Sequence, residues 1–161
     1  MSSHRLERAP VAQTGMLIRR PAADVFAAFV DPEITTRFWF TRSSGRLETG
    51  RQVQWDWEMY GVSALVTVKA VDPFERILIE WPGSNGPTAV EFRFTSSGDG
   101  TTFVSIRNDG FEGTGDELLK QAMDSMEGFS LVLAGLKAWL EHDVSLGLIA
   151  DRYPMGQTDP G

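Results

Sequence analysis

The feature that most constrains the fold is a long amphipathic segment at residues 115–144. Its apolar side chains recur at steps of three and four, so a helix with 3.6 residues per turn gathers them on one face. This face comprises Leu118, Leu119, Ala122, Met126, Phe129, Leu133, Leu136, Leu140 and Val144, and the opposite face carries Lys120, Asp124, Glu127, Glu141 and His142. Such a helix is about 45 Å long at 1.5 Å per residue. It therefore needs a whole sheet to cover its apolar face.

The middle of the chain supplies that sheet. Between residues 53 and 109, apolar and polar side chains alternate with a period of two, which is typical of strands with one covered face. Short turn signals, such as 82–83 and 97–100, separate the runs and predict an antiparallel meander. A first strand is expected at 14–18. Two helices should follow it up to Phe38, since Pro21 and Pro32 suit first helical turns.

We therefore predict an α+β fold. A curved antiparallel sheet of six to seven strands wraps around the long C-terminal helix, with two short helices after the first strand. The folded domain is expected at 14–145. Residues 1–13 should form a flexible N-terminal arm, and residues 146–161 a largely irregular C-terminal tail.

Composition excludes several classes of function. The chain has 22 acidic and 15 basic residues and a net charge of -7, which repels nucleic acid and anionic membranes. The absence of cysteine excludes disulfides and thiolate metal sites. Residues 1–12 contain no apolar run typical of a signal peptide, and no segment reaches the roughly 20 apolar residues of a membrane span. A cytoplasmic protein is expected.

An aromatic set in the middle strands suggests a ligand cavity between the sheet and the long helix. If the sheet curls around the helix, these side chains point into the enclosed space, together with methionines that adapt to irregular shapes. The candidate ligand-binding residues are Trp39, Trp55, Trp57, Met59, Trp81, Phe92, Phe94, Asn108, Met126 and Phe129. Asn108, and also Arg42 and Thr88, could orient a polar ligand group at the mouth. A solid aromatic core is the alternative that the pattern leaves open.

The sequence offers no candidate catalytic residue, metal site or cofactor site. Four strand carboxylates alternate onto the solvated face of the sheet, where they would pair with basic residues across strands; they are Asp56, Glu58, Glu80 and Glu91. His4 lies in the expected arm, and His142 lies on the polar face of the long helix. Two such histidines assemble neither a catalytic triad nor a metal site.

Two glycines in the long helix predict a close approach by another element. Gly128 and Gly135 are seven residues apart, and each costs an exposed helix interior about 1 kcal/mol relative to alanine. A neighbouring helix, the N-terminal arm or a second subunit would each explain this cost. Trp139 at the edge of the apolar stripe would add to an interface, so a homodimer is one of the alternatives.

Several segments together resemble the SRPBCC superfamily, whose members have the START-like helix-grip fold, and within it the bacterial domains similar to the activator of heat-shock-protein-90 ATPase. The resemblance rests on 25–33, Phe38-Trp39, 55–61, 71–77 and 127–129. It implies binding of a small hydrophobic molecule without a metal or covalent cofactor. Two alternatives remain: a protein-interaction module that acts on a chaperone through its outer surfaces, and a cyclase or hydrolase-type enzyme. The enzyme requires an ionisable side chain inside the cavity, and the strand alternation speaks against one.

Overall fold

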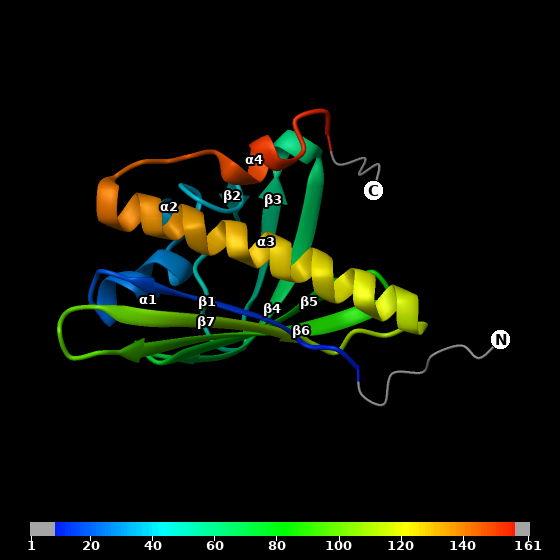
Figure 1. Ribbon diagram of the computed structural model, residues 1–161, viewed down its shortest axis with the longest axis horizontal. Coiled ribbons are helices and arrows are strands. Elements are labelled where there is room, and N and C mark those ends of the chain that lie inside the picture. The colour runs from blue at the N-terminus through cyan, green and yellow to red at the C-terminus, as the bar shows by residue number, and fades with distance from the viewer. Residues whose placement is uncertain (1–8, 157–161) are drawn as a thin grey trace.

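The chain folds around one antiparallel sheet, crossed by a long helix (Figure 1). The computed structural model describes residues 9–156, and within them the sheet has seven strands in the order β1-β7-β6-β5-β4-β3-β2. The strands are β1 Ala12–Ile18, β2 Arg42–Ser43, β3 Gln52–Trp57, β4 Val62–Asp72, β5 Arg76–Gly83, β6 Gly86–Ser96 and β7 Thr102–Asp109. The helices are α1 Ala22–Val30, α2 Pro32–Thr35, η1 Glu58–Tyr60 (a 3-10 turn), α3 Gly115–His142 and α4 Leu148–Arg152.

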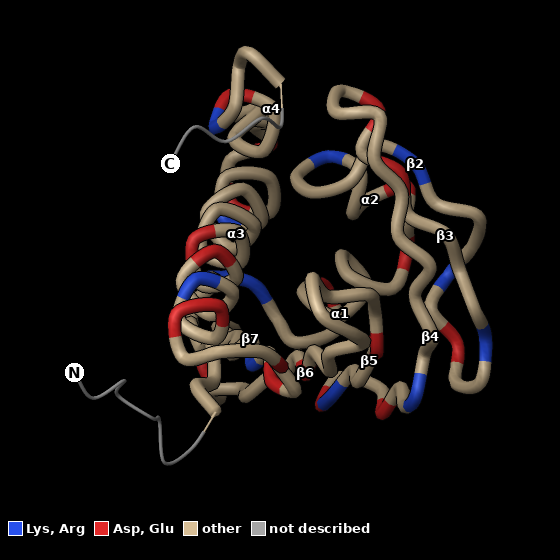
Figure 2. Tube along the Cα trace, turned by 90° about the vertical axis from the view of Figure 1, so that its right-hand side faces the viewer, with Lys and Arg blue, Asp and Glu red and all other residues tan. Residues whose placement is uncertain are grey.

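The predicted α+β helix-grip architecture is confirmed. Figure 2 shows the sheet bending from β7 and β6 through β5 towards β3, with α1 and α2 inside the curve and α3 beside it. A register shift between Val68 and Ala70, where β4 pairs with β5, adds local twist to the bend. The short loops anticipated from the turn residues join β3 to β7 as an antiparallel meander.

The two short helices fill one end of the curve. The Asp31 side chain accepts a hydrogen bond from the Glu33 backbone N–H at 3.0 Å, and Pro32 occupies the first turn of α2. The buried Thr35 hydroxyl donates to the backbone carbonyls of Ala28 and Asp31, which fixes the corner between α1 and α2. The α2 helix ends at Thr35, three residues earlier than expected, and turns lead on to Phe38.

The long helix α3 begins with a capping box, in which Thr114 and Glu117 satisfy each other's backbone N–H groups. Near its other end, the Lys137 ammonium donates to the Leu17 carbonyl at 2.8 Å and to Glu141 at 2.7 Å. Burial raises the pKa of Glu141, but hydrogen bonds from Lys137 and from the Arg19 backbone N–H outweigh it and hold the pKa below its usual range. These contacts tie α3 to the end of β1.

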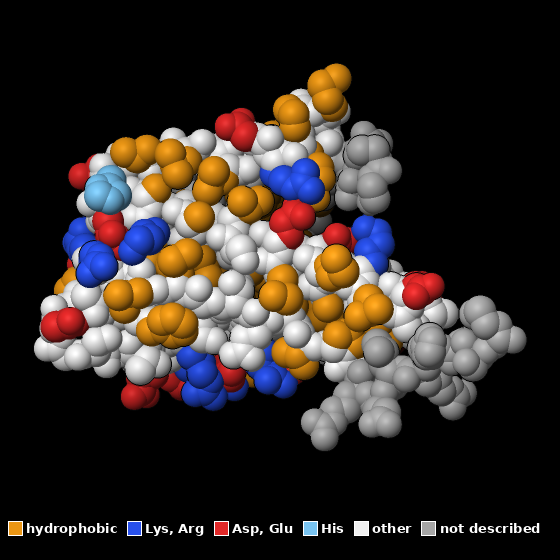
Figure 3. Space-filling view, in the orientation of Figure 1, with side chains coloured by type: hydrophobic (Ala, Val, Ile, Leu, Met, Phe, Trp, Pro, Cys, Tyr) orange, Lys and Arg blue, Asp and Glu red, His pale blue; other side chains and the backbone are white. Residues whose placement is uncertain are grey.

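The buried face of α3 is narrower than the sequence predicts. Phe129, Leu133 and Leu136 are buried, but Leu119 and Met126 remain exposed although they share the predicted apolar stripe. Figure 3 shows apolar side chains on the surface of this face of the molecule. The helix packs mainly along β1, a single strand that covers a narrower stripe than a broad sheet face would.

The C-terminal segment differs from the expected irregular tail. Residues 148–152 form the helix α4, and Ile149 packs against the hydrophobic core. Figure 1 places α4 above α3, next to the tips of β3 and β4. At the other end, β1 begins at Ala12, two residues before the predicted start of the first strand. His4 and residues 157–161 lie outside the described part of the chain.

Candidate ligand pocket

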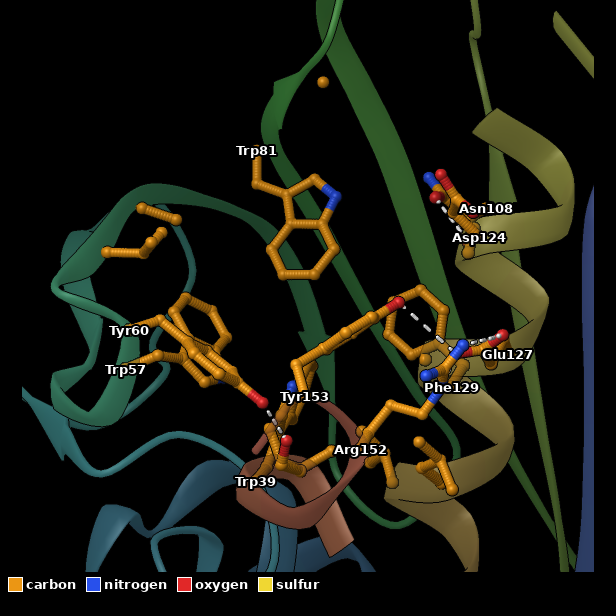
Figure 4. Close-up of a pocket in the computed structure, with 18 of the residues that line it drawn as sticks. Trp39, Trp57, Tyr60, Trp81, Asn108, Asp124, Glu127, Phe129, Arg152 and Tyr153 are labelled. Carbon is orange, nitrogen blue, oxygen red and sulfur yellow. Dashed lines mark hydrogen bonds and ion pairs between the residues drawn. The ribbon is translucent and has the colours of Figure 1, made fainter. Parts of the chain in front are cut away.

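A pocket of about 670 Å³ opens between α3, the tips of β3 to β5, and α4. Figure 4 shows how the elements supply its walls: Trp57 and Tyr60 lie on one side, Trp81 on a second, and Phe129 faces them from α3. Tyr153 and Arg152 enter from the segment of α4. The walls therefore combine aromatic rings with aliphatic side chains such as Val62 and Val132, and polar groups lie towards α3 and α4.

Half of the predicted ligand-binding residues line this pocket. They are Trp39, Trp57, Trp81, Asn108 and Phe129. These side chains come from α3, from the ends of β3, β5 and β7, and from the loop after α2. The concave face of the sheet and the facing side of α3 thus bring together residues that are up to 90 positions apart in sequence.

Three other candidates belong to a solid core instead. Trp55, Phe92 and Phe94 are buried and contribute nothing to the pocket wall. The Trp55 ring stacks on Phe40 with a centroid distance of 4.5 Å, and Phe92 packs on Phe29 at 5.1 Å. The rings of α1 and of the loop after α2 fill this end of the curved sheet. Part of the aromatic set therefore forms a solid core, and another part lines the pocket.

The predicted roles of Met59 and Met126 are not supported by their positions. Met59 is 39% exposed because β3 ends at Trp57 and the chain turns through η1, so the alternation that would bring Met59 inward is interrupted. Gly61, at φ 63°, completes this turn in the left-handed region. Met126 is 43% exposed, and it lies on the side of α3 away from the pocket lining.

Asn108 is buried at the pocket wall, as its inward parity predicts, but its amide is already engaged. Its nitrogen donates to the Thr88 hydroxyl at 3.1 Å and to the Ala89 carbonyl at 2.7 Å, while the Ser125 hydroxyl donates to its oxygen at 2.8 Å. Arg42 lies elsewhere: its side chain is 72% exposed and pairs with Asp56 at 3.9 Å. The amide network joins β6, β7 and α3, and so fixes the position of the wall.

The pocket residues that sequence reasoning missed belong to α4 and its partners. The Tyr60 hydroxyl donates to the Ile149 carbonyl and, at 3.3 Å, to the Ala150 carbonyl. Arg152 forms an ion pair with Glu127 of α3, and the Tyr153 hydroxyl lies 3.4 Å from the same carboxylate. These contacts hold α4 across the pocket between η1 and α3 (Figure 4).

The contact between Tyr60 and α4 can be tested by substitution. Tyr60→Phe keeps the ring but removes the donor, so we expect to lose about 1 kcal/mol of local α4 stability. Hydrogen exchange of the amides at 148–152 should accelerate about fivefold, whereas exchange in the middle of α3 should stay constant. Unchanged exchange at 148–152 would show that the hydroxyl does not hold α4 in place.

The same contact predicts a pH dependence. Burial raises the pKa of the Tyr60 hydroxyl above its ordinary value. The hydroxyl donates only while protonated, so its stabilisation is complete below the unfolded pKa of about 10 and is lost as pH rises through the higher folded pKa. At neutral pH the contact is therefore intact.

Ionisable side chains at the pocket lie in ion pairs. Lys120 pairs with Asp124 at 2.8 Å along α3, and Arg152 pairs with Glu127. Within residues 9–156, no group of three or more acidic or histidine side chains has the arrangement of a metal site. A carboxylate that strand alternation places outside, Glu91, pairs with Arg76 at 2.6 Å and with Arg93 at 2.9 Å.

The two glycines of α3 have different surroundings. A Cβ atom at Gly135 would lie 3.1 Å from the Cβ of Phe38, so the predicted close approach is made within the chain by the loop after α2. A Cβ atom at Gly128 would meet no atom within 4 Å, and this residue lines the pocket. Trp139 is partly buried and lies beneath the Arg37 guanidinium, 5.1 Å from the ring centroid. These residues need no second subunit to explain them.

Comparison with known proteins agrees with this architecture. The family description that matches the sequence, over residues 19–141, is "Activator of Hsp90 ATPase homolog 1-like protein". Among proteins with curated descriptions, none matches the sequence. No helix within residues 9–156 has the length and apolar character to span a membrane.

Solved structures show the same fold. A protein from Staphylococcus saprophyticus is similar at 30% identity and a TM-score of 0.72, covering 85% of this chain and 96% of that one. The Aha1 dimer from Colwellia psychrerythraea has 16% identity and a TM-score of 0.70, covering 83% and 97%. A protein from Mesorhizobium loti has 16% identity and a TM-score of 0.73, covering 84% and 99%.

Proposed function

This chain belongs to the family of activator of Hsp90 ATPase homolog 1-like proteins, and on that premise we propose that it binds a small hydrophobic molecule between the curved sheet and α3. The observation that carries the proposal is the pocket itself. Its volume of about 670 Å³ lies within the range of about 300–1,000 Å³ that is usual for small-molecule sites. A ligand there would cover the rings of Trp57, Trp81 and Phe129.

The chemistry of the pocket supports binding more than catalysis. Aromatic and aliphatic side chains supply much of its lining, and burying them against a ligand removes apolar area from water. The carboxylates and cations at its rim are held in pairs, so their charges are already matched within the protein. An enzyme of the same superfamily would need one of these groups to act as an acid or base on the ligand.

Tryptophan fluorescence gives a direct test. We expect a saturable change in emission when the protein is titrated with fatty acids and with neutral ring compounds, because Trp57 and Trp81 lie at the pocket wall. N-acetyltryptophanamide, titrated in parallel, corrects for absorption by the compound. The absence of a saturable change across the whole panel would contradict the proposal.

The family description favours a second candidate, an interaction with a chaperone. In this case the outer surface of the sheet would make the contact, and it carries rows of paired charges such as Arg76, Glu91 and Arg93. The measurement is the ATPase rate of a bacterial Hsp90 with and without this protein. Stimulation that survives blocking of the pocket and is lost on Glu91→Lys would favour the chaperone role over ligand carriage.

A further inference from the structure

Three tryptophan side chains bring indole N–H groups to the pocket: Trp39, Trp57 and Trp81. An indole nitrogen is a donor only, and it usually finds an acceptor when it is buried. Within the described residues 9–156, none of these three nitrogens donates a hydrogen bond to a protein acceptor. The protein therefore leaves donors unused at the wall of its pocket.

The Trp39 indole makes this point most clearly. Its side chain is only 6% exposed and packs against Trp55 at 4.8 Å and Phe129 at 5.8 Å. In the described part of the chain, no sealed side-chain nitrogen or oxygen lacks a partner. The unpaired Trp39 N–H must therefore keep some accessible surface, and the pocket is the space that this residue lines.

Trp81 presents its donor in a different direction. Figure 4 shows its nitrogen on the side of the indole that faces α3, across the open part of the pocket. The ring stacks on Phe129, with a centroid distance of 5.7 Å and an interplanar angle of 27°. The indole N–H points outward in the plane of its ring. It can therefore reach an acceptor on the edge of a flat ligand that lies in the open part of the pocket.

Three other polar side chains of the pocket are already matched to protein partners. The Asn108 amide is held by Thr88, Ala89 and Ser125. The Tyr60 hydroxyl donates to α4, and Glu127 pairs with Arg152. The groups left to recognise a ligand are thus apolar side chains and the indole donors, together with the hydroxyl of the exposed Ser84 at the rim.

On the basis of the proposed function, we propose that the ligand is a flat, uncharged ring compound with an oxygen acceptor, such as a ketone, that accepts a hydrogen bond from Trp81. Before a ligand binds, an indole N–H at an open pocket wall can donate to solvent water. A purely apolar ligand displaces that water and leaves the donor unpaired, whereas a ketone replaces the lost bond. The oxygen therefore decides which ring compound binds, although the rings supply most of the buried area.

A matched pair of compounds tests this inference. Fluorenone and fluorene share one three-ring skeleton and differ by a carbonyl in place of a methylene group. We expect calorimetry to show that the protein binds fluorenone about tenfold more tightly than fluorene, the effect of one satisfied donor. Fluorene is the more hydrophobic of the two, so hydrophobicity alone would give the opposite preference.

The variant Trp81→Phe keeps an aromatic ring in the wall, but it removes the donor together with part of the ring surface. Both compounds lose the same ring surface, so both affinities should fall, but the preference for fluorenone over fluorene should also fall to about twofold or less. Equal binding of the two compounds by the parent, or a preference that survives in Trp81→Phe, would overturn the inference while leaving the pocket as a binding site. If neither compound binds while fatty acids still give a saturable change, this inference fails and the proposed function stands; if no compound of the whole panel binds, the proposed function itself fails.

Discussion

Replacing Gly128 with leucine is expected to block ligand binding and, at the same time, to stabilise the fold. Gly128 lines the pocket, and a Cβ atom there meets no atom within 4 Å, so the leucine side chain extends into open space. Its four carbons would displace a comparable volume of ligand. At about 0.8 kcal/mol per buried carbon, this costs the ligand roughly 3 kcal/mol, or on the order of 100-fold in affinity.

The stability of the same variant should change in the opposite direction. Glycine inside a helix costs about 1 kcal/mol relative to good helix formers, so Gly128→Leu should raise the unfolding free energy by up to that amount. Urea unfolding measures this change, and titration with a pocket ligand measures the loss of affinity. A variant that is more stable yet binds as well as the parent would show that the ligand site lies elsewhere.

Gly135→Leu is the matched control for this variant. The substitution is the same, it lies two helical turns further along α3, and it faces Phe38 with a Cβ distance of only 3.1 Å. Overpacking at this position should cost about 1–3 kcal/mol. Leucine should therefore stabilise the fold at position 128 and destabilise it at position 135. Both substitutions replace a helix glycine, so a loss of ligand affinity seen only in Gly128→Leu is due to the filled pocket and not to helix propensity.

The architecture could be predicted because its determinants are local. Alternation in the strands and the three-and-four spacing in α3 are read within short windows, and the antiparallel order follows from short turns. The same alternation places Trp55, Trp57 and Trp81 on the concave face, where the structure has them. These patterns fix which face a side chain occupies.

The patterns do not determine how far along that face the packed core extends before the pocket begins. Trp55 is buried because Phe40 stacks on it from the loop after α2, whereas Trp57, two residues later on the same face, lies where the rings end and the pocket begins. The distinction depends on contacts between segments far apart in the chain. A list of inward-facing residues therefore mixes core and pocket.

The contribution of α4 was beyond the sequence patterns for a related reason. A helix of five residues is too short to show a periodicity, and Gly147, Pro154 and Gly156 around it are typical of irregular structure. Its position depends on Tyr60 and Glu127, which lie about 90 and 25 residues earlier in the chain. The turn at η1 that places Tyr60 there also interrupts the strand alternation that would have pointed Met59 inward.

Substitution of two tryptophans by alanine should separate the core from the pocket. Trp55 is 1% exposed and makes no part of the pocket wall, so Trp55→Ala removes a large ring from a filled space. We expect this variant to lose about 3–5 kcal/mol of unfolding free energy. For a domain of this size, that corresponds to a fall of about 10 °C in melting temperature.

Trp81→Ala should have the complementary effect, because Trp81 is only partly buried and lines the open pocket. Its stability loss should be roughly half that of Trp55→Ala, since less apolar area leaves the core. Its affinity for a pocket ligand should fall at least about tenfold. Calorimetric melting and fluorescence titration on both variants provide the comparison. Equal losses of stability in the two variants would mean that the ring of Trp81 belongs to the packed core, and that the pocket wall lies elsewhere.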